Sequence, residues 1–133
     1  MAGVDYKSFY SPPVGVTATG ADIAARKTVK ISGVGGAENP LVVIGAAAND
    51  KIYGVIVDAI AENAIGDCLQ RGKIVMTAGS GGWTAGDHLS SDSAGNLIAV
   101  AANTYFCAVA LETVSAAGTG MVEVNCPATW HEA

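Results

Sequence analysis

Short apolar runs separated by turn residues recur along the chain from residue 28 onward. Residues 121–126 give the clearest case, because Val122 and Val124 alternate with Glu123 and Asn125. A period of two puts one set of side chains on the buried face of a strand and the other set toward solvent. Strands are predicted at residues 28–31, 41–44, 52–59, 73–77, 97–100, 105–113 and 121–126. Their spacing predicts an all-β sandwich or barrel.

The predicted architecture is a single small β-barrel or sandwich domain with an extended N-terminal arm. We place the arm at residues 1–24, where Pro12 and Pro13 force extended backbone, and the β domain at residues 25–133. Good helix formers within residues 58–64 allow a helix of one or two turns at most. The expected core consists of Val55, Val57, Ile98, Val109, Leu111, Val122 and Val124.

Two segments twenty positions apart share a Gly-Asp pair, at Gly66-Asp67 and at Gly86-Asp87. Each pair is followed by a glycine and then by the start of an apolar strand. This echo predicts two similar corners that begin two similar β units. A solenoid would need three or more repeats, so that architecture is not expected.

Residues 81–100, "GGWTAGDHLSSDSAGNLIAV", hold the polar side chains that an active-site loop would use. Asp92 and Gly95, however, occupy the first and fourth positions of a type I turn, and such a turn closes a hairpin between residues 86–90 and 97–100. A metal site at Asp87, His88 and Asp92 is conceivable, but the spacing matches no known metal-binding loop. We therefore interpret the stretch as a β-hairpin.

The sequence predicts no catalytic site, no cofactor and no metal site. No serine lies in a G-x-S-x-G elbow, and the glycine clusters at residues 33–36 and 79–82 lack the patterns that bind phosphate. The histidines are His88 and His131, and His131 is two residues from the end of the sequence. Non-enzymatic function is the expectation.

Charge, hydropathy and cysteine content limit the classes of partner and the cellular setting that are expected. All seven Lys and Arg residues precede residue 74, and the net charge is −5, so nucleic-acid binding is not expected. No apolar run approaches the ~18 residues that cross a bilayer, and the first residues do not resemble a secretory signal. Cys68, Cys107 and Cys126 are odd in number and far apart, which predicts three free and mostly buried thiols.

Residues 85–124, "AGDHLSSDSAGNLIAVAANTYFCAVALETVSAAGTGMVEV", resemble the C-terminal half of the decoration (cement) proteins of tailed-phage capsids. Gly86-Asp87 begins the shared pattern, and residues 108–112 stand where that family has "GvAle". Residues 118–124 end it, and the likeness covers about residues 50–126. This chain has Cys107-Ala108 where the family usually has glycine before Val-Ala.

The resemblance implies a β-tulip-like structural protein of a bacteriophage virion. Proteins of this family bind the outer surface of an assembled icosahedral capsid, often as a homotrimer, and stabilise the shell. The resemblance thus implies the major capsid protein as the partner, and assembly in the cytoplasm of the host bacterium.

The candidate contacts with capsid or a second subunit are six residues of the arm and of one glycine-rich loop. They are Tyr6, Phe9, Tyr10, Pro12, Pro13 and Trp83. Aromatic side chains in an extended arm either pack on their own domain or anchor a partner at low entropic cost. Trp83 likewise either caps its own barrel or lies between subunits.

Two other classes of function stay open. Another phage structural module, such as the base of a head fibre, would differ from a decoration protein in symmetry and partner. A small β-barrel enzyme or ligand-binding protein would differ in having a pocket.

Overall fold

The computed structural model describes residues 7–9, 12–33, 39–45, 51–100 and 106–126. Their secondary structure is all β, as predicted. The strands are β1 (Lys7–Phe9), β2 (Val14–Ala18), β3 (Thr28–Gly33), β4 (Leu41–Ile44), β5 (Gly54–Ile56), β6 (Ile65–Leu69), β7 (Arg71–Thr77), β8 (His88–Ser91), β9 (Leu97–Ala99), β10 (Ala108–Ala110) and β11 (Thr119–Asn125). Within the described ranges, no helix has the length and apolar character needed to cross a membrane.

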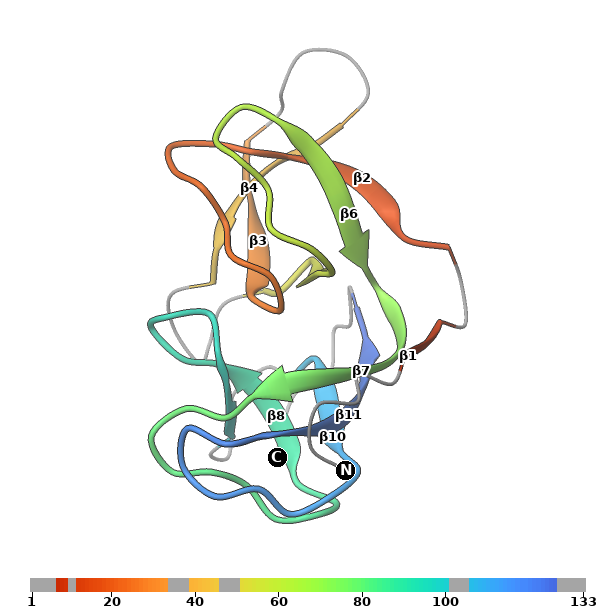
Figure 1. Cartoon of the computed structure of the whole chain (residues 1–133), viewed down its shortest axis with the longest axis vertical. Coiled ribbons are helices and arrows are strands. Elements are labelled where there is room, and N and C mark those ends of the chain that lie inside the picture. The colour runs from red at the N-terminus through yellow and green to blue at the C-terminus, as the bar shows by residue number, and fades with distance from the viewer. Residues whose placement is uncertain (1–6, 10–11, 34–38, 46–50, 101–105, 127–133) are drawn as a thin grey trace.

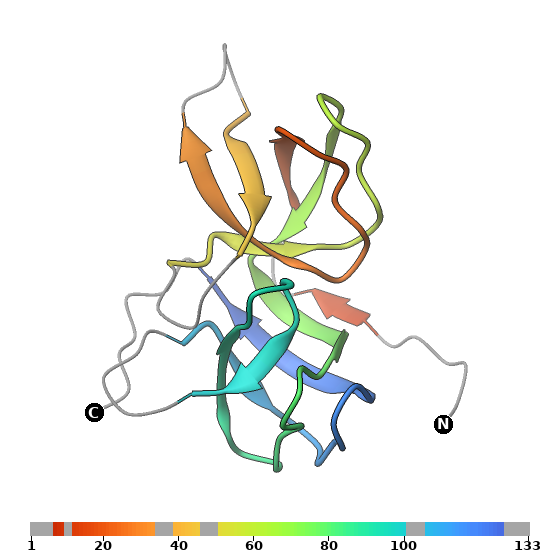
Figure 2. The ribbon, with the colours of Figure 1, turned by 90° about the vertical axis from the view of Figure 1, so that its left-hand side faces the viewer.

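The strands form two lobes stacked along the long axis of the molecule (Figure 1). The first lobe, residues 14–69, is a closed barrel with the strand order β2-β4-β3-β5-β6. The second lobe, residues 71–126 together with β1, is a six-stranded sheet in the order β1-β7-β11-β10-β8-β9. Only Gln70 separates β6 from β7, so the chain passes directly from one lobe into the other. Figure 2 shows the same two lobes from the side.

The two lobes repeat one topology. In the first lobe β2 pairs with β6, β6 with β5, β5 with β3 and β3 with β4, and a parallel pairing of β2 with β4 closes the barrel. In the second lobe β7 pairs with β11, β11 with β10, β10 with β8 and β8 with β9. A parallel bridge from Ala78 to Leu97 then joins the end of β7 to β9. Strands β2 to β6 therefore correspond in order to β7 to β11, and β1 is an addition to the second lobe.

Each lobe contains two corners of the same construction. A buried residue forms an antiparallel bridge to the opposite corner. Three residues later, a residue with positive φ donates its N–H to a backbone carbonyl at or just beyond the end of a strand. The four pairs of bridge residue and turn residue are Ile23 with Arg26 (φ 64°), Ile60 with Asn63 (φ 67°), Trp83 with Gly86 (φ 92°) and Val114 with Ala117 (φ 60°). Ile23 bridges Ile60, and Trp83 bridges Val114, so each lobe joins its own two corners.

The Gly-Asp echo matched two positions that are not equivalent. Gly86 (φ 92°) lies between β7 and β8, so its counterpart in the first lobe is Arg26 (φ 64°), between β2 and β3. Gly66 instead lies inside β6, and its counterpart is Gly120 of β11. Residues other than glycine adopt the left-handed conformation at these corners, so a match between glycines does not locate them.

The predicted strands are confirmed at all seven places, and the hairpin of β8 and β9 is confirmed as well. Two of the predicted strands are much shorter than expected. Within residues 52–59 only β5 is a strand, and within residues 105–113 the described strand is β10. Residues 58–64 form no helix; they contain the bridge residue Ile60 and a turn at Glu62 and Asn63. Three strands were not predicted, namely β1, β2 and β6.

The predicted core is correct for four residues and wrong for three. Val55, Val57, Val122 and Val124 are buried in one cluster, which also joins the two lobes. Val109 and Ile98 are only half-buried, and Leu111 is 42% exposed. The alternation along β10 runs opposite to our expectation, because Ala108 and Ala110 face the interior and the larger side chains face outward.

The Arg26 side chain forms hydrogen bonds that connect the first lobe to the second. Its Nε donates to the Val57 carbonyl at 3.1 Å, and its Nη1 donates to the Val75 carbonyl of β7 at 3.0 Å. The neighbouring Lys27 Nζ donates to Asn96 Oδ1 at 2.7 Å. One corner of the barrel is therefore bonded both to its own lobe and to the other.

Candidate functional site

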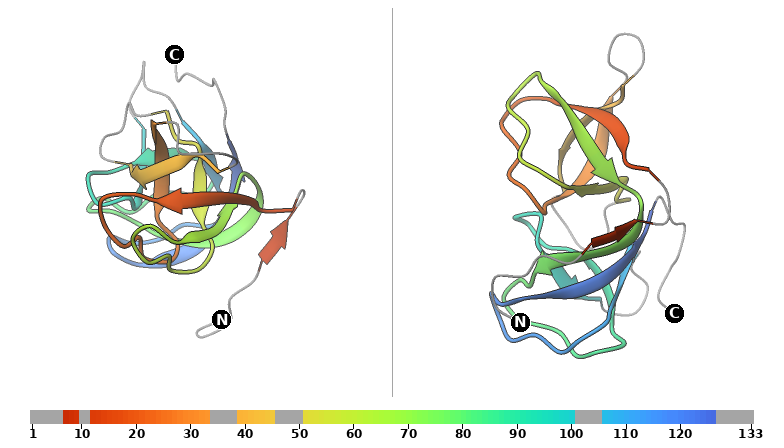
Figure 3. Two further views of the ribbon diagram at one scale, coloured as in Figure 1. Left: turned by 90° about the horizontal axis from the view of Figure 1, so that it is seen from above. Right: turned by 45° about the vertical axis from the view of Figure 1, so that its right-hand side comes forward.

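β1 carries the N-terminal candidates to the edge of the second lobe. Residues 7–9 pair antiparallel with residues 72–74 of β7, and Figure 3 shows β1 lying along β7. The Phe9 side chain is half-buried and packs against the core of the second lobe. Tyr6 and Tyr10 lie outside the described residues. Phe9 thus contacts its own chain, while contacts of the two tyrosines stay a prediction.

Pro12 and Pro13 lead from β1 to the barrel. Pro12 is exposed and Pro13 is half-buried. Val14, directly after them, begins β2, which pairs with β6 and with β4. Residues 14–18 fall within the predicted arm of residues 1–24, so in the structure the barrel begins at Val14. Buried Val16 and Ala18 alternate with half-buried neighbours, which is the pattern of a strand. The pattern is weak in the sequence because the residues of β2 are small.

Trp83 lies between the two corners of its own lobe. Its side chain is 4% exposed, and its indole Nε1 donates to the Glu112 carbonyl at 2.8 Å. Its backbone exchanges hydrogen bonds with Val114, so ring and backbone together hold the corners closed. A contact of this site with a second subunit stays a prediction, and exposed corner residues such as Thr84 and Thr113 would carry it.

The polar residues of the 81–100 stretch serve its turns, as predicted. Asp92 Oδ1 accepts the N–H groups of Ala94 at 2.8 Å and of Asn96 at 2.9 Å, which closes the loop between β8 and β9. Asp87 Oδ2 accepts the Thr84 N–H at 2.9 Å. The His88 ring stacks on Phe106, with 4.1 Å between the ring centroids. Among the described residues, no three His, Cys, Asp or Glu side chains gather in a way that could hold a metal ion.

Two hollows flank the corners of the first lobe, and sequence reasoning did not find them. One, of about 370 Å³, lies between residues 19–23 and the β4 residues Val43 and Ile44. The other, of about 410 Å³, lies between residues 22–24 and residues 59–61. Both adjoin the bridge between Ile23 and Ile60, and small residues such as Ala21, Ala24, Ala59 and Ala61 leave the space open.

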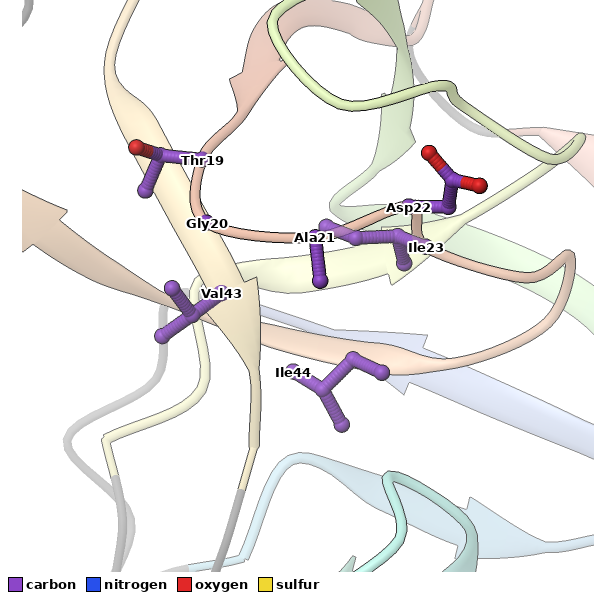
Figure 4. A pocket seen from close by; sticks show the side chains of 7 residues that line it. All are labelled: Thr19, Gly20, Ala21, Asp22, Ile23, Val43 and Ile44. Carbon is purple, nitrogen blue, oxygen red and sulfur yellow. The ribbon is translucent and has the colours of Figure 1, made fainter.

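The hollows offer apolar surface and a single ionisable lining residue, Asp22. Asp22 Oδ1 accepts the Glu62 N–H at 2.8 Å and so holds the two corner loops together. In Figure 4 its carboxylate points away from Val43 and Ile44. General acid–base chemistry needs a titratable group within hydrogen-bond reach of the substrate, and Asp22 is the one such group that lines these two hollows.

Comparison with solved structures finds a similar fold in a phage protein. No protein-family model matches the sequence, and no curated protein matches it significantly. Among solved structures, the fold is similar to the N base of the head fibre protein gp8.5 of bacteriophage phi29, with a TM-score of 0.66 and 14% sequence identity. The match covers 92% of this chain and 95% of that chain. The two chains therefore share a fold over nearly their whole length.

Proposed function

We propose that the protein is a structural component of a phage virion that binds the outer surface of the capsid and stabilises the shell. The observation that carries this proposal is the fold shared with the phi29 head fibre base, which spans both lobes and 92% of the chain. The resemblance of residues 85–124 to capsid decoration proteins supports it from an independent direction, because it rests on sequence alone.

The proposed partner is the major capsid protein, and the proposed assembly is a homotrimer. The contacts assigned to these partners are the arm residues Tyr6, Tyr10, Pro12 and Pro13, and the exposed corner that Trp83 supports. Phe9 contributes indirectly, because it holds β1 on the second lobe and thereby sets where the arm leaves the domain. No chemical reaction and no cofactor form part of the proposal.

The base of a head fibre is the second candidate, and the similarity of the fold to the phi29 head fibre base favours it directly. In that case the protein would still sit on the virion but would carry a projecting fibre. The two candidates differ in what lies beyond the protein on the particle. A third class, a ligand-binding barrel, would use the two hollows of the first lobe.

Shells of the source phage assembled without this protein test the proposal. We expect the purified chain to co-sediment with such shells, to add density to their outer surface in cryo-electron micrographs, and to raise the temperature at which they open. Absence of bound protein at saturating concentration would refute capsid binding. Images of complete virions then separate the two candidates, since a fibre extending from the added density identifies a fibre base.

A further inference from the structure

The three cysteines lie buried near the junction of the lobes, and two of them are in contact. Cys107 directly precedes β10, and Cys126 directly follows β11. The Cys126 Sγ donates to the Cys107 carbonyl at 3.6 Å, and the two thiols also share a hydrogen bond. Cys68 lies in β6, and its thiol instead accepts a hydrogen bond from the Val55 backbone.

The contact forms where β10 begins beside the end of β11. Ala108 of β10 is paired with Val124 of β11, and one step further the Asn125 N–H donates to the Cys107 carbonyl at 2.9 Å. In a regular ladder the side chain of the next residue, Cys126, would point to the face opposite that of Cys107. The ladder is irregular here, because the Cys107 N–H donates to the Leu89 carbonyl of β8 at 2.9 Å while its carbonyl accepts from β11. Both cysteines lie in the interior, at 3% exposure each, and the Cys126 Sγ contacts the Cys107 backbone.

We propose that Cys107 and Cys126 form an intramolecular disulfide when the folded protein is oxidised by a peroxide. One thiolate attacks a peroxide oxygen, which yields a sulfenic acid and releases water once a proton is taken up. The second thiolate then attacks that sulfur, the S–S bond forms, and the sulfenic oxygen leaves as a second water. Two thiols and one hydrogen peroxide thus become one disulfide and two waters.

The surroundings set the speed and the effect of this step. The hydrogen bond with the Cys107 side chain, together with burial, raises the pKa of the Cys126 thiol well above 9.0, so the reaction is slow at neutral pH and faster in mild alkali. The bond would tie the start of β10 to the end of β11 and enclose the corner at Val114. Because Cys126 N–H donates to the Gln70 carbonyl at 2.6 Å, the staple also anchors the junction of the lobes. None of this depends on the proposed function.

Intact mass and thiol counting test the proposal on the full chain. The reduced protein and its Cys68→Ser, Cys107→Ser and Cys126→Ser variants are treated with hydrogen peroxide at mildly alkaline pH, and the remaining thiols are alkylated. We expect the native chain and Cys68→Ser to lose the mass of two hydrogens, with peptides 107 and 126 linked. The other two variants should form no intramolecular bond. A bond that involves Cys68, or oxygen addition without a bond, overturns the proposal.

A second measurement removes any dependence on access to the buried thiols. The chain is refolded from urea in glutathione redox buffers, and the fraction of the 107–126 bond is compared with that in urea. A bond that fits the fold is favoured by it, so we expect the equilibrium constant for the bond to be at least roughly tenfold larger in native conditions. A constant that is equal or smaller in native conditions shows that the fold rejects the bond.

Discussion

Thr28 of the first lobe and Ser91 of the second share a hydrogen bond of 2.7 Å in the interior of the protein. Both residues are fully buried, at 0% exposure. Thr28 Oγ1 donates to Ser91 Oγ, and Ser91 Oγ donates in turn to the Asp92 carbonyl at 2.9 Å. The Thr28 N–H also donates to the Gly95 carbonyl at 2.9 Å. This polar chain fixes β3 against the hairpin of β8 and β9.

Replacing Ser91 with alanine should destabilise the protein by about 1 to 3 kcal/mol, because the Thr28 hydroxyl then lies buried without its acceptor. Thr28→Val should cost less, since Ser91 keeps its bond to the Asp92 carbonyl. The double variant should cost less than the sum of the two, as expected for partners in contact. Urea unfolding of the four proteins measures this coupling, and strict additivity would contradict it.

Gly86 and Ala117 have positive φ at the two corners of the second lobe, and opposite changes in stability are expected when glycine and alanine are exchanged there. Ala117 adopts φ 60°, which strains a residue with a Cβ, so Ala117→Gly should stabilise the protein by roughly 1 kcal/mol. Gly86→Ala should destabilise it by a similar amount, since φ is 92° and no atom lies within 4 Å to clash with the added methyl. Thermal unfolding checks both. Shifts of the same sign in the two variants would exclude backbone strain as the cause.

Gly66 and Gly120 occupy the same place in the two lobes, beneath the bridge residues. A Cβ on Gly66 would collide with the Ile60 side chain, and a Cβ on Gly120 with that of Val114. Alanine at either position should therefore destabilise the protein by about 1 to 3 kcal/mol through overpacking. Gly81→Ala is the matched control, because it has open space around it and should change stability by less than about 0.5 kcal/mol.

The Cys68 thiol predicts a loss of stability in alkali. Burial raises its pKa from 9.0 to about 12, against a weaker lowering by the Val55 backbone. The folded state therefore favours the neutral thiol. The free energy of unfolding keeps its full value below pH 9 and falls as the pH rises toward 12, by ~4 kcal/mol in all from this thiol. Cys68→Ala should show a smaller fall of the unfolding free energy between pH 8 and pH 10.5, with both proteins kept reduced. Parallel pH profiles would refute this assignment.

Two truncations separate the arm from the strand that it contains. Removal of residues 2–6 leaves β1 in place and should give a fully stable protein with weakened binding to shells, because Tyr6 is lost. Removal of residues 2–13 also deletes β1 and the packing of Phe9, so it should lower stability as well. Shell co-sedimentation and urea unfolding measure the two effects separately. Unchanged shell binding by both truncations would show that the arm has no part in it.

Sequence reasoning located strands well where apolar residues are large and poorly where they are small. The strands at residues 41–44 and 121–126 were readable because Val, Ile and Leu mark them, whereas β2 relies on Val16 and Ala18. The inward face of β10 was misjudged for the same reason, since alanines fill it. The two-lobed repeat stayed hidden because its corners need a left-handed backbone, which Arg, Asn, Gly and Ala all adopt here.

The site was predictable only in part. Asp92 was placed correctly, because turn preferences act between residues that are close in sequence. The hollows beside Ile23 arise from two corners that meet across the barrel, and the contact between Cys107 and Cys126 arises because the start of β10 lies beside the end of β11. Both are long-range relations, on which local patterns carry no information.

The pairing of β1 with β7 also orders events in time. β1 is synthesised before β2 to β11, but Lys7 is paired with Ile74, about half the chain later. By then every strand that closes the first barrel has been made, so chains that fold from the N-terminus can build that barrel before β1 has a partner. β1 is therefore synthesised before the strands of the first barrel but pairs after them. Until it pairs with β7, this edge of β7 has no neighbouring strand in the newly made protein.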